Sequence, residues 1–351
     1  SELESETESE TEREIEKSTK HWSELLSTCD PAIDLEAKNV EIFKTLRTKD
    51  AFFMSWNAKL PMGMKLIGKG GQAEIFEDTS EEGVAYKVFK HKSSLEDLQK
   101  QWPDRIFPIT KDFVRFHILL GALLFEDGRF AFKLRRCWGD LRTLMDRRMD
   151  RNNNQGPPFR TVLVKQIMLD IATEMLYLHQ HDVLHRDLKA SNILIDIVRP
   201  SKLPIQFQGG APDDTLMLGH ADQAYFMKYH VADFECSVLV QGTGFWRAPE
   251  ILLAIRNNTI TSNTFTKMAD VYSYAMTYYE VLTGCFPFKD RQREDYDWVL
   301  DGNKPELPDH VGPLTRKLLV QCWDLDPLKR PTFENICKQL NLALTLGKKY
   351  E

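Results

Sequence analysis

The side chains best suited to chemistry in this chain of 351 residues lie in one short run, HRDLKASNIL, from His185 to Leu194. Asp187 could accept the proton of an attacking hydroxyl group, and Lys189 could neutralise charge on a phosphoryl group during its transfer. The amide of Asn192 could hold a magnesium ion. A solvated loop after a helix is the ordinary alternative, but such a loop does not require all three side chains. The run therefore indicates phosphoryl transfer from Mg-ATP.

Two upstream segments could bind the phosphates of a nucleotide. Residues 68–73, GKGGQA, are rich in glycine, which lets backbone N–H groups approach phosphate oxygens closely. The third glycine of the usual pattern is an alanine here, so this segment alone predicts only a β-turn. Val84, Tyr86 and Val88 alternate as in a strand with one buried face, and that strand carries Lys87.

Four further motifs complete a resemblance to the protein kinase superfamily over about residues 60–348. They are VAYK at 84–87, DFE at 233–235, APE at 248–250 and DPLKRPTF around Arg330. The runs GTGFWRAPE and CWDLDPLKRPTF are most similar to the plant-type tyrosine-kinase-like group of Ser/Thr kinases. The resemblance implies an α+β fold with two lobes, a small antiparallel β lobe over a large, mainly α lobe.

The resemblance also implies a role for each candidate catalytic or binding residue. Asp187 would deprotonate a Ser or Thr hydroxyl of a protein substrate, Lys189 would stabilise the transferred charge, and Lys87 would hold the α- and β-phosphates of ATP. Asn192 and Asp233 would bind magnesium, so the implied cofactors are ATP and Mg²⁺. The remaining nucleotide-binding positions are Ile67, Gly68, Lys69, Gly70, Gly71, Gln72, Ala73 and Ile75.

Supporting contacts follow from the same resemblance. Asp270 would anchor the catalytic loop from below, and Arg330 would pair with Glu250. Thr243 would hydrogen-bond to the catalytic aspartate and lysine, as in Ser/Thr kinases. The hinge of the nucleotide cleft would lie near residues 135–138. The alignment before it is ambiguous by one position, so the residue at the back of the pocket is Lys133 or Leu134.

Two residues depart from the family pattern. Glu235 replaces the glycine of DFG, which restricts the backbone and adds negative charge beside a magnesium site. We expect this glutamate to be tolerated rather than to bind metal, and to be replaceable by glycine without loss of activity. The glutamate expected to pair with Lys87 is not evident. Glu96 is the nearest candidate, but Pro103 shortens its helix and a solvated position is favoured.

Regulation can be inferred from the short activation segment. Arg186 resembles the arginine that binds a phosphate on this segment in many kinases. Between Asp233 and the Gly242-Thr243 pair, Ser237 is the only hydroxyl residue. We therefore expect a domain that needs no phosphorylation of this segment, with Arg186 satisfied by a fixed carboxylate such as that of Glu235.

Composition divides the chain into three parts. Residues 1–32 are rich in glutamate, so we expect an acidic disordered tail. Residues 33–59 predict a helical extension, which packs on the kinase-like domain or belongs to an upstream domain of a longer protein. The domain comprises a small lobe at 60–137 and a large lobe at 138–348, with a surface insertion at 199–225.

Periodicity predicts several elements inside this domain. Residues 121–134 read as a hairpin with Asp-Gly at its turn. Apolar residues at helical spacing predict helices at 161–181, 314–323 and 332–346.

Overall composition excludes several functions. The net charge of −6 and pI of about 5.9 argue against general nucleic-acid binding. No run of about 18 apolar residues predicts a membrane span. The six cysteines are scattered and form no CxxC pair, which argues against a zinc site and indicates a reducing, cytoplasmic location.

Two alternatives to an active kinase remain open. A pseudokinase would signal by binding and switching, as mixed-lineage-kinase-domain-like effectors do, and the departures at Glu235 and Glu96 favour it. Against it, all four residues of the phosphoryl-transfer machinery are present, namely Lys87, Asp187, Asn192 and Asp233. A metabolic enzyme on the same fold would need a substrate pocket in place of the APE motif, so we rank it last.

Overall fold

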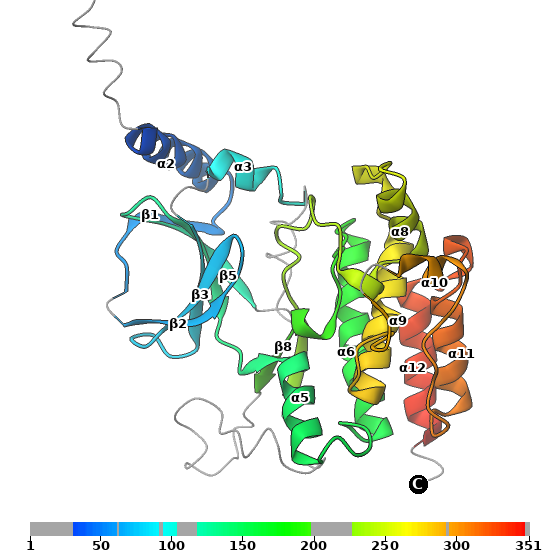
Figure 1. Ribbon diagram of the computed structural model, residues 1–351. Helices are drawn as coiled ribbons and strands as arrows, with labels where there is room; N and C mark the ends of the chain where they lie inside the picture. Colours follow the sequence, from blue (N-terminus) through cyan, green and yellow to red (C-terminus); the bar gives the residue numbers. More distant parts are fainter. Residues whose placement is uncertain are drawn as a thin grey trace, which may run out of the picture.

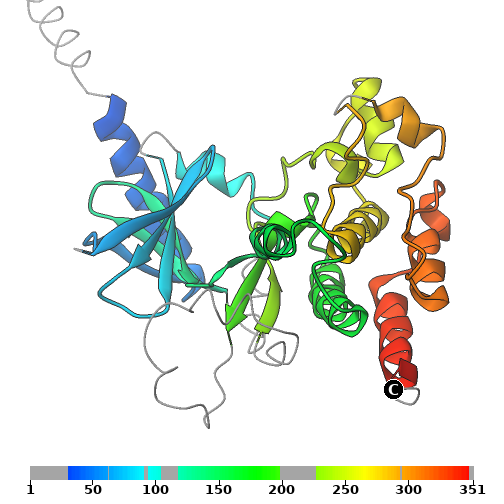
Figure 2. The same cartoon turned by 60° about the horizontal axis from the view of Figure 1, so that its bottom comes forward.

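The computed structural model describes residues 31–61, 63–90, 94–103, 118–197, 227–292 and 295–347. They form two lobes, a small lobe built on a β-sheet and a larger lobe of helices (Figures 1 and 2). The predicted α+β architecture is confirmed. The insertion at 199–225, and all of the predicted tail except its last two residues, lie outside the described residues.

The small lobe contains a six-stranded sheet in the order β1-β5-β6-β4-β3-β2. Its neighbouring strands are antiparallel except β1 and β5, which run parallel with Phe53 opposite Ala122. The parallel pair arises because β1 comes from the N-terminal extension. The strands are β1 (Phe53–Ala58), β2 (Met64–Lys69), β3 (Ala73–Asp78), β4 (Val84–Phe89), β5 (Leu119–Phe125) and β6 (Phe130–Arg135).

Strand β4 is buried on both faces, whereas its sequence predicted one buried face. Val84, Tyr86 and Val88 join one apolar cluster, and Phe89 joins a second cluster on the opposite face. Because β4 lies between β6 and β3, neither edge is open, and the Phe89 face is covered by helices. Lys87 is therefore held by a strand that is fixed on all sides.

Two helices cover that second face. Helix α2 (Pro31–Lys49) inserts Phe43, which is fully buried, with its ring centroid 5.6 Å from that of Phe53. The Leu95 N–H at the start of α3 (Leu95–Gln99) donates a 2.9 Å hydrogen bond to Asn39 Oδ1 of α2. The predicted helical extension thus packs into the small lobe (Figure 1).

The predicted hairpin and helices are confirmed. Strands β5 and β6 meet at the Asp-Gly turn, where Gly128 has φ +79°. A three-stranded sheet in the order β7-β8-β9 lies at the junction of the lobes. It is formed by β7 (Gly139–Asp140), β8 (Ile193–Ile197) and β9 (Met227–Val231). The helices of the large lobe are α5 (Leu141–Arg151), α6 (Thr161–Gln180), α8 (Pro249–Arg256), α9 (Lys267–Thr283), α10 (Tyr296–Leu300), α11 (Pro313–Cys322) and α12 (Phe333–Gly347).

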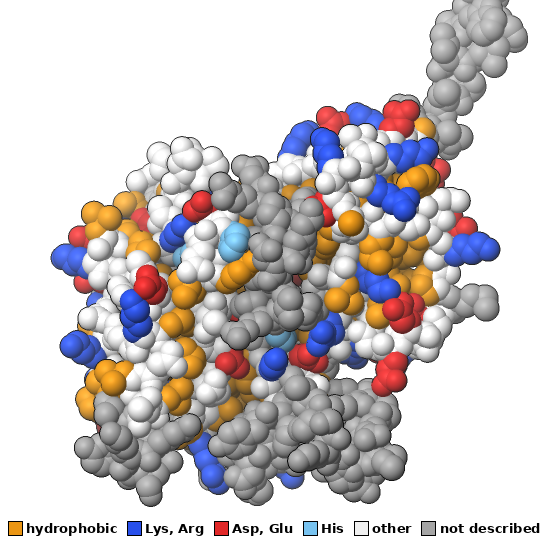
Figure 3. Space-filling view, turned by 180° about the vertical axis from the view of Figure 1, so that it is seen from behind, with side chains coloured by type: hydrophobic (Ala, Val, Ile, Leu, Met, Phe, Trp, Pro, Cys, Tyr) orange, Lys and Arg blue, Asp and Glu red, His pale blue; other side chains and the backbone are white. Residues whose placement is uncertain are grey.

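The large lobe is organised around α9, whose residues are almost all buried. Nearby, Arg330 donates two 2.8 Å hydrogen bonds to the carboxylate of Glu250, which confirms that predicted pair. Seen from behind, charged side chains of both signs are interspersed with hydrophobic ones (Figure 3). Within the described residues, no helix has the length and apolar character needed to cross a bilayer.

Candidate active site

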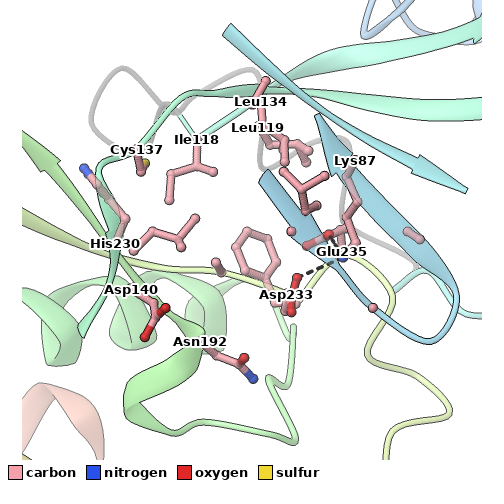
Figure 4. Close-up of a pocket in the computed structure, with 18 of the residues that line it drawn as sticks. Lys87, Ile118, Leu119, Leu134, Cys137, Asp140, Asn192, His230, Asp233 and Glu235 are labelled. Atoms are coloured by element: carbon pink, nitrogen blue, oxygen red, sulfur yellow. Dashed lines mark hydrogen bonds and ion pairs between the residues drawn. The ribbon is translucent and has the colours of Figure 1, made fainter. Parts of the chain in front are cut away.

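A cavity of about 640 Å³ lies between the lobes (Figure 4). The turn between β2 and β3 covers it, β4 and β6 form its upper wall, and residues around β8 and β9 form its floor. Both predicted magnesium ligands line the cavity. So do all nine predicted nucleotide-binding residues, namely Ile67, Gly68, Lys69, Gly70, Gly71, Gln72, Ala73, Ile75 and Lys87.

The structure resolves the ambiguity at the back of this cavity. Leu134 pairs with Ala85 across the sheet and lines the cavity, whereas Lys133 pairs with Tyr86. The Lys133 ammonium lies 2.8 Å from a carboxylate oxygen of Glu81, outside the cavity lining. Successive strand residues point to opposite faces, so only one of the two could face the nucleotide.

The catalytic loop brings three side chains into a closed hydrogen-bonded triangle. Lys189 Nζ donates to Asp187 Oδ2 and to Thr243 Oγ1, each at 2.7 Å. The Thr243 hydroxyl donates to Asp187 Oδ1, also at 2.7 Å. Asn192 Nδ2 donates to the backbone carbonyl of Asp187 at 2.8 Å. The predicted contact of Thr243 with the aspartate and lysine is confirmed.

Asp270 fixes this loop from below, as predicted. Its carboxylate accepts hydrogen bonds from the backbone N–H groups of His185 and Arg186 and from His179 Nε2, all at 2.9 Å. Burial alone would raise the pKa of Asp270, but the hydrogen bond and charge of His179 hold it below its usual range. Arg186 has φ +66°, a strained value for a residue with a side chain. The carboxylate therefore holds the backbone in a conformation that it would otherwise leave.

Lys87 forms two ion pairs inside the cavity. Its ammonium lies 2.6 Å from Glu235 Oε1 and 2.9 Å from Asp233 Oδ1 (Figure 4). Burial alone would lower the pKa of Lys87, but the two carboxylates raise it above its ordinary value. Lys87 in turn holds the pKa of Asp233 below its usual range. The lysine is therefore fully charged where phosphates would lie.

These contacts correct one expectation, the pairing of Glu235 with Arg186, which is wrong. The carboxylate of Glu235 contacts Lys87, a partner that the sequence did not indicate. Arg186 Nη1 instead donates to the carbonyl of Val238, and the guanidinium lies 4.9 Å from the ring centroid of Phe265.

Glu96 is not the partner of Lys87. It lies on α3 with its side chain 48% exposed and pairs with Lys38 at 2.6 Å. The favoured interpretation of Glu96 as a solvated helix residue agrees with this position.

Sequence reasoning missed a buried acid–base pair that lines the cavity. His230 Nδ1 lies 2.7 Å from Glu174 Oε1, and the other carboxylate oxygen accepts the N–H of Val231. Burial raises the pKa of Glu174 to about 7. The available signal was the position of Glu174 on the apolar face of α6, three residues after Ile171 and four before Leu178.

The two predicted metal ligands suit a magnesium ion that arrives with a nucleotide. Mg²⁺ prefers oxygen ligands and commonly takes only one or two carboxylates plus phosphate oxygens. Asp233 supplies a carboxylate, and the amide nitrogen of Asn192 is bound to the catalytic loop, which leaves its oxygen as the available ligand atom. Among the described residues, no group of three or more His, Cys, Asp or Glu forms a self-sufficient metal site.

Comparison with known protein families identifies the family to which this chain belongs. The protein kinase domain model matches residues 63–341. The chain belongs to the protein kinase family. The matched range contains the glycine-rich turn, Lys87, the catalytic loop and Arg330, while α2 and β1 precede it.

Proteins similar to this chain include kinases of plants and of an animal. The chain is 35% identical over 216 residues to a light-sensor protein kinase of Ceratodon purpureus, which covers 58% of this chain and 16% of that protein. It is 26% identical over 302 residues to serine/threonine-protein kinase STY46 of Arabidopsis thaliana. The aligned region covers 81% of this chain and 44% of the relative. Mitogen-activated protein kinase kinase kinase 12 of Rattus norvegicus is 29% identical over 190 residues, 54% of this chain and 18% of the relative. The chain thus spans less than half of each of these proteins.

Proposed function

We propose that this kinase domain transfers the γ-phosphoryl group of Mg-ATP to serine or threonine hydroxyls of a protein substrate. The observation that carries the proposal is the Asp187–Lys189–Thr243 triangle, with all three bonds at 2.7 Å. A scaffold that only binds partners has no use for a base whose carboxylate is held so closely. The cavity beside it supplies Lys87 for the phosphates.

The chain's own residues account for the parts of phosphoryl transfer. Asp187 orients the substrate hydroxyl and accepts its proton, while its two oxygens are fixed by Thr243 and Lys189. Lys189 stabilises charge on the group in transfer, and Lys87 holds the α- and β-phosphates. Asn192 would hold magnesium together with the carboxylate of the DFE motif. The metal would supply charge neutralisation at the phosphate oxygens. Positioning and electrostatics therefore do most of the catalysis.

Specificity for serine and threonine rests on two observations. Lys189 lies two residues after Asp187 and contacts Thr243, the arrangement expected for Ser/Thr kinases. The Arabidopsis relative STY46 is named as a serine/threonine-protein kinase. The physiological substrate is a protein that presents such a hydroxyl to the catalytic loop.

A pseudokinase is the second candidate function, and one observation favours it. Asp233 Oδ1 is bound to Lys87 at 2.9 Å, so a magnesium ligand is engaged by the lysine. The Asp233 side chain is nonetheless 57% exposed, which leaves it accessible to a metal ion. In an active kinase this bond would give way so that Asp233 could hold magnesium, whereas in a pseudokinase it would persist.

Thermal unfolding with Mg-ATP and a transfer assay separate the two candidates. Mg-ATP at a hundredfold excess over its Kd should add about 2.7 kcal/mol of stability. Labelled phosphate should then appear on a serine- or threonine-containing peptide but not on its tyrosine counterpart. Stabilisation without transfer would favour a nucleotide-binding pseudokinase, and the absence of both effects would refute the proposed kinase activity.

A further inference from the structure

The partner of Lys87 comes from an unexpected place in the chain. Glu96 is the only glutamate between Lys87 and Glu126 in the sequence, and it is bound to Lys38 at 2.6 Å. The helix α3 that carries it is five residues long and is capped by Ser94. Neither the position nor the bonding of Glu96 makes it available to the cavity.

Glu235 has the properties that a permanent counter-ion requires. Its side chain is 7% exposed and lies 2.6 Å from the ammonium of Lys87, which is 15% exposed. Asp233, the second partner, is 57% exposed. Removing the partner of a buried charge strongly destabilises the folded protein. An exposed partner, by contrast, can be replaced by water or by an ion. The enclosed bond to Glu235 is therefore the durable one of the two.

The backbone that carries Glu235 is braced on two sides. The next residue, Cys236, packs against the apolar cluster that contains Trp102 and Phe43. The Val238 N–H donates a 3.1 Å hydrogen bond to the carbonyl of Gln101, two residues after the end of α3. On the other side, the Ser237 hydroxyl donates to the carbonyl of Leu184, just before the catalytic loop, at 2.8 Å. The backbone that carries Glu235 is thus held by both lobes.

We propose that Glu235 is the positioning residue for Lys87, so that the counter-ion of the phosphate-binding lysine is supplied by the activation segment and not by the helix after β4. Glu235 keeps Lys87 directed into the cavity when Asp233 turns to the metal ion. Without Glu235, Asp233 would be the one remaining carboxylate partner of Lys87 among the described residues, and Lys87 would compete with magnesium for it. This role rests on the proposed nucleotide-dependent function.

The first arm of the test measures the ion pair without any nucleotide. Urea unfolding is compared for the parent, Lys87→Met, Glu235→Gln and the double variant, because glutamine keeps the shape of glutamate and removes its charge. If the pair exists in solution, the midpoint shift caused by Lys87→Met should be smaller in the Glu235→Gln background. Equal shifts in both backgrounds would overturn the proposal.

The second arm measures positioning. Glu235→Gln should weaken ATP binding about tenfold and raise the Mg²⁺ concentration for half-maximal ATP binding by a similar factor. Adenosine, which lacks phosphates, should bind as it does to the parent. Glu235→Asp should recover part of the loss, because it restores the charge on a shorter side chain. The matched control Glu96→Gln should change the binding of neither ATP nor adenosine.

The two arms keep failure of this role distinct from failure of the proposed function. Coupling in urea together with unchanged ATP and Mg²⁺ dependence in Glu235→Gln would make the pair purely structural and would overturn the positioning role. Equal weakening of ATP and adenosine would also overturn it, because that result indicates general damage to the cavity. A parent chain that shows the coupling but binds no ATP would refute the proposed function, and the positioning role with it.

Discussion

Replacing Asp270 by asparagine tests how much of the active site depends on one buried carboxylate. Asp270 accepts three hydrogen bonds at 2.9 Å, two of them from the backbone of His185 and Arg186. An asparagine keeps one acceptor oxygen, and its NH₂ group would face a backbone donor. About two bonds to a charged acceptor are lost, each worth about 1.5–3 kcal/mol. We expect the free energy of unfolding to fall by about 3–6 kcal/mol.

The same change should lower turnover in the folded protein. Arg186 has φ +66°, and its N–H is held in that conformation by Asp270 Oδ1. Released from this bond, the backbone should relax and move the adjacent Asp187. A displacement of about 1 Å at a reacting group costs about 10²-fold in rate, so kcat should fall by that order. Urea unfolding followed by circular dichroism gives the stability, and phosphate transfer to a peptide gives kcat.

The pH dependence of stability supplies an independent check. Because the folded-state pKa of Asp270 lies below its ordinary value, near 3.9, its contribution is present above that pH and is lost as the pH falls through the folded pKa. The stability gap between parent and Asp270→Asn should therefore narrow in acid. Asp97→Asn, at an exposed position, serves as the control. An unfolding midpoint and kcat equal to those of the parent at neutral pH would refute the reasoning.

Three further outcomes follow from the described contacts. Asp187→Asn should bind Mg-ATP as the parent does and lower kcat by about 10²–10⁴-fold; equal rates would remove Asp187 from the mechanism. Phe43→Ala should cost about 3–5 kcal/mol in urea unfolding beside the exposed Glu41→Ala, because its ring is fully buried; matching midpoints would show that α2 is not part of the fold. Phosphatase treatment should leave the activity of the parent unchanged, because Ser237 is 1% exposed and its hydroxyl donates to the Leu184 carbonyl; a large loss on treatment that Ser237→Ala does not show would identify a working switch.

The catalytic residues could be predicted from sequence because they are local. Asp187, Lys189 and Asn192 lie within one loop, whose backbone sets their mutual positions. The nucleotide-binding residues lie on adjacent strands β2, β3 and β4, so alternation and turn chemistry bring them together. The helix α2 was likewise predicted from its own spacing, but the surface it covers was not, because periodicity identifies an apolar face and not its partner.

The partner of Lys87 could not be predicted for a different reason. Glu235 lies 148 residues away in sequence, and the family pattern places glycine at that position. A comparison of motifs shows only that such a residue departs from the family pattern. It does not indicate which side chain that residue contacts. The Glu174–His230 pair joins residues that are 56 apart in the sequence, so it could not be predicted for the same reason. Long-range pairs of this kind depend on tertiary packing, which brings distant side chains together after the local elements form.

The parallel pairing of β1 with β5 has a consequence for synthesis of the chain. Phe53 of β1 lies opposite Ala122 of β5, and the ribosome makes the chain between them in roughly 3–14 seconds at about 5–20 residues per second. During that interval β1 has no strand to pair with, and its apolar residues are exposed to other chains. Closing so long a loop is slow compared with forming a local hairpin. Strand β1 is therefore made well before β5, its neighbour in the sheet, and is among the last parts of the small lobe to be secured.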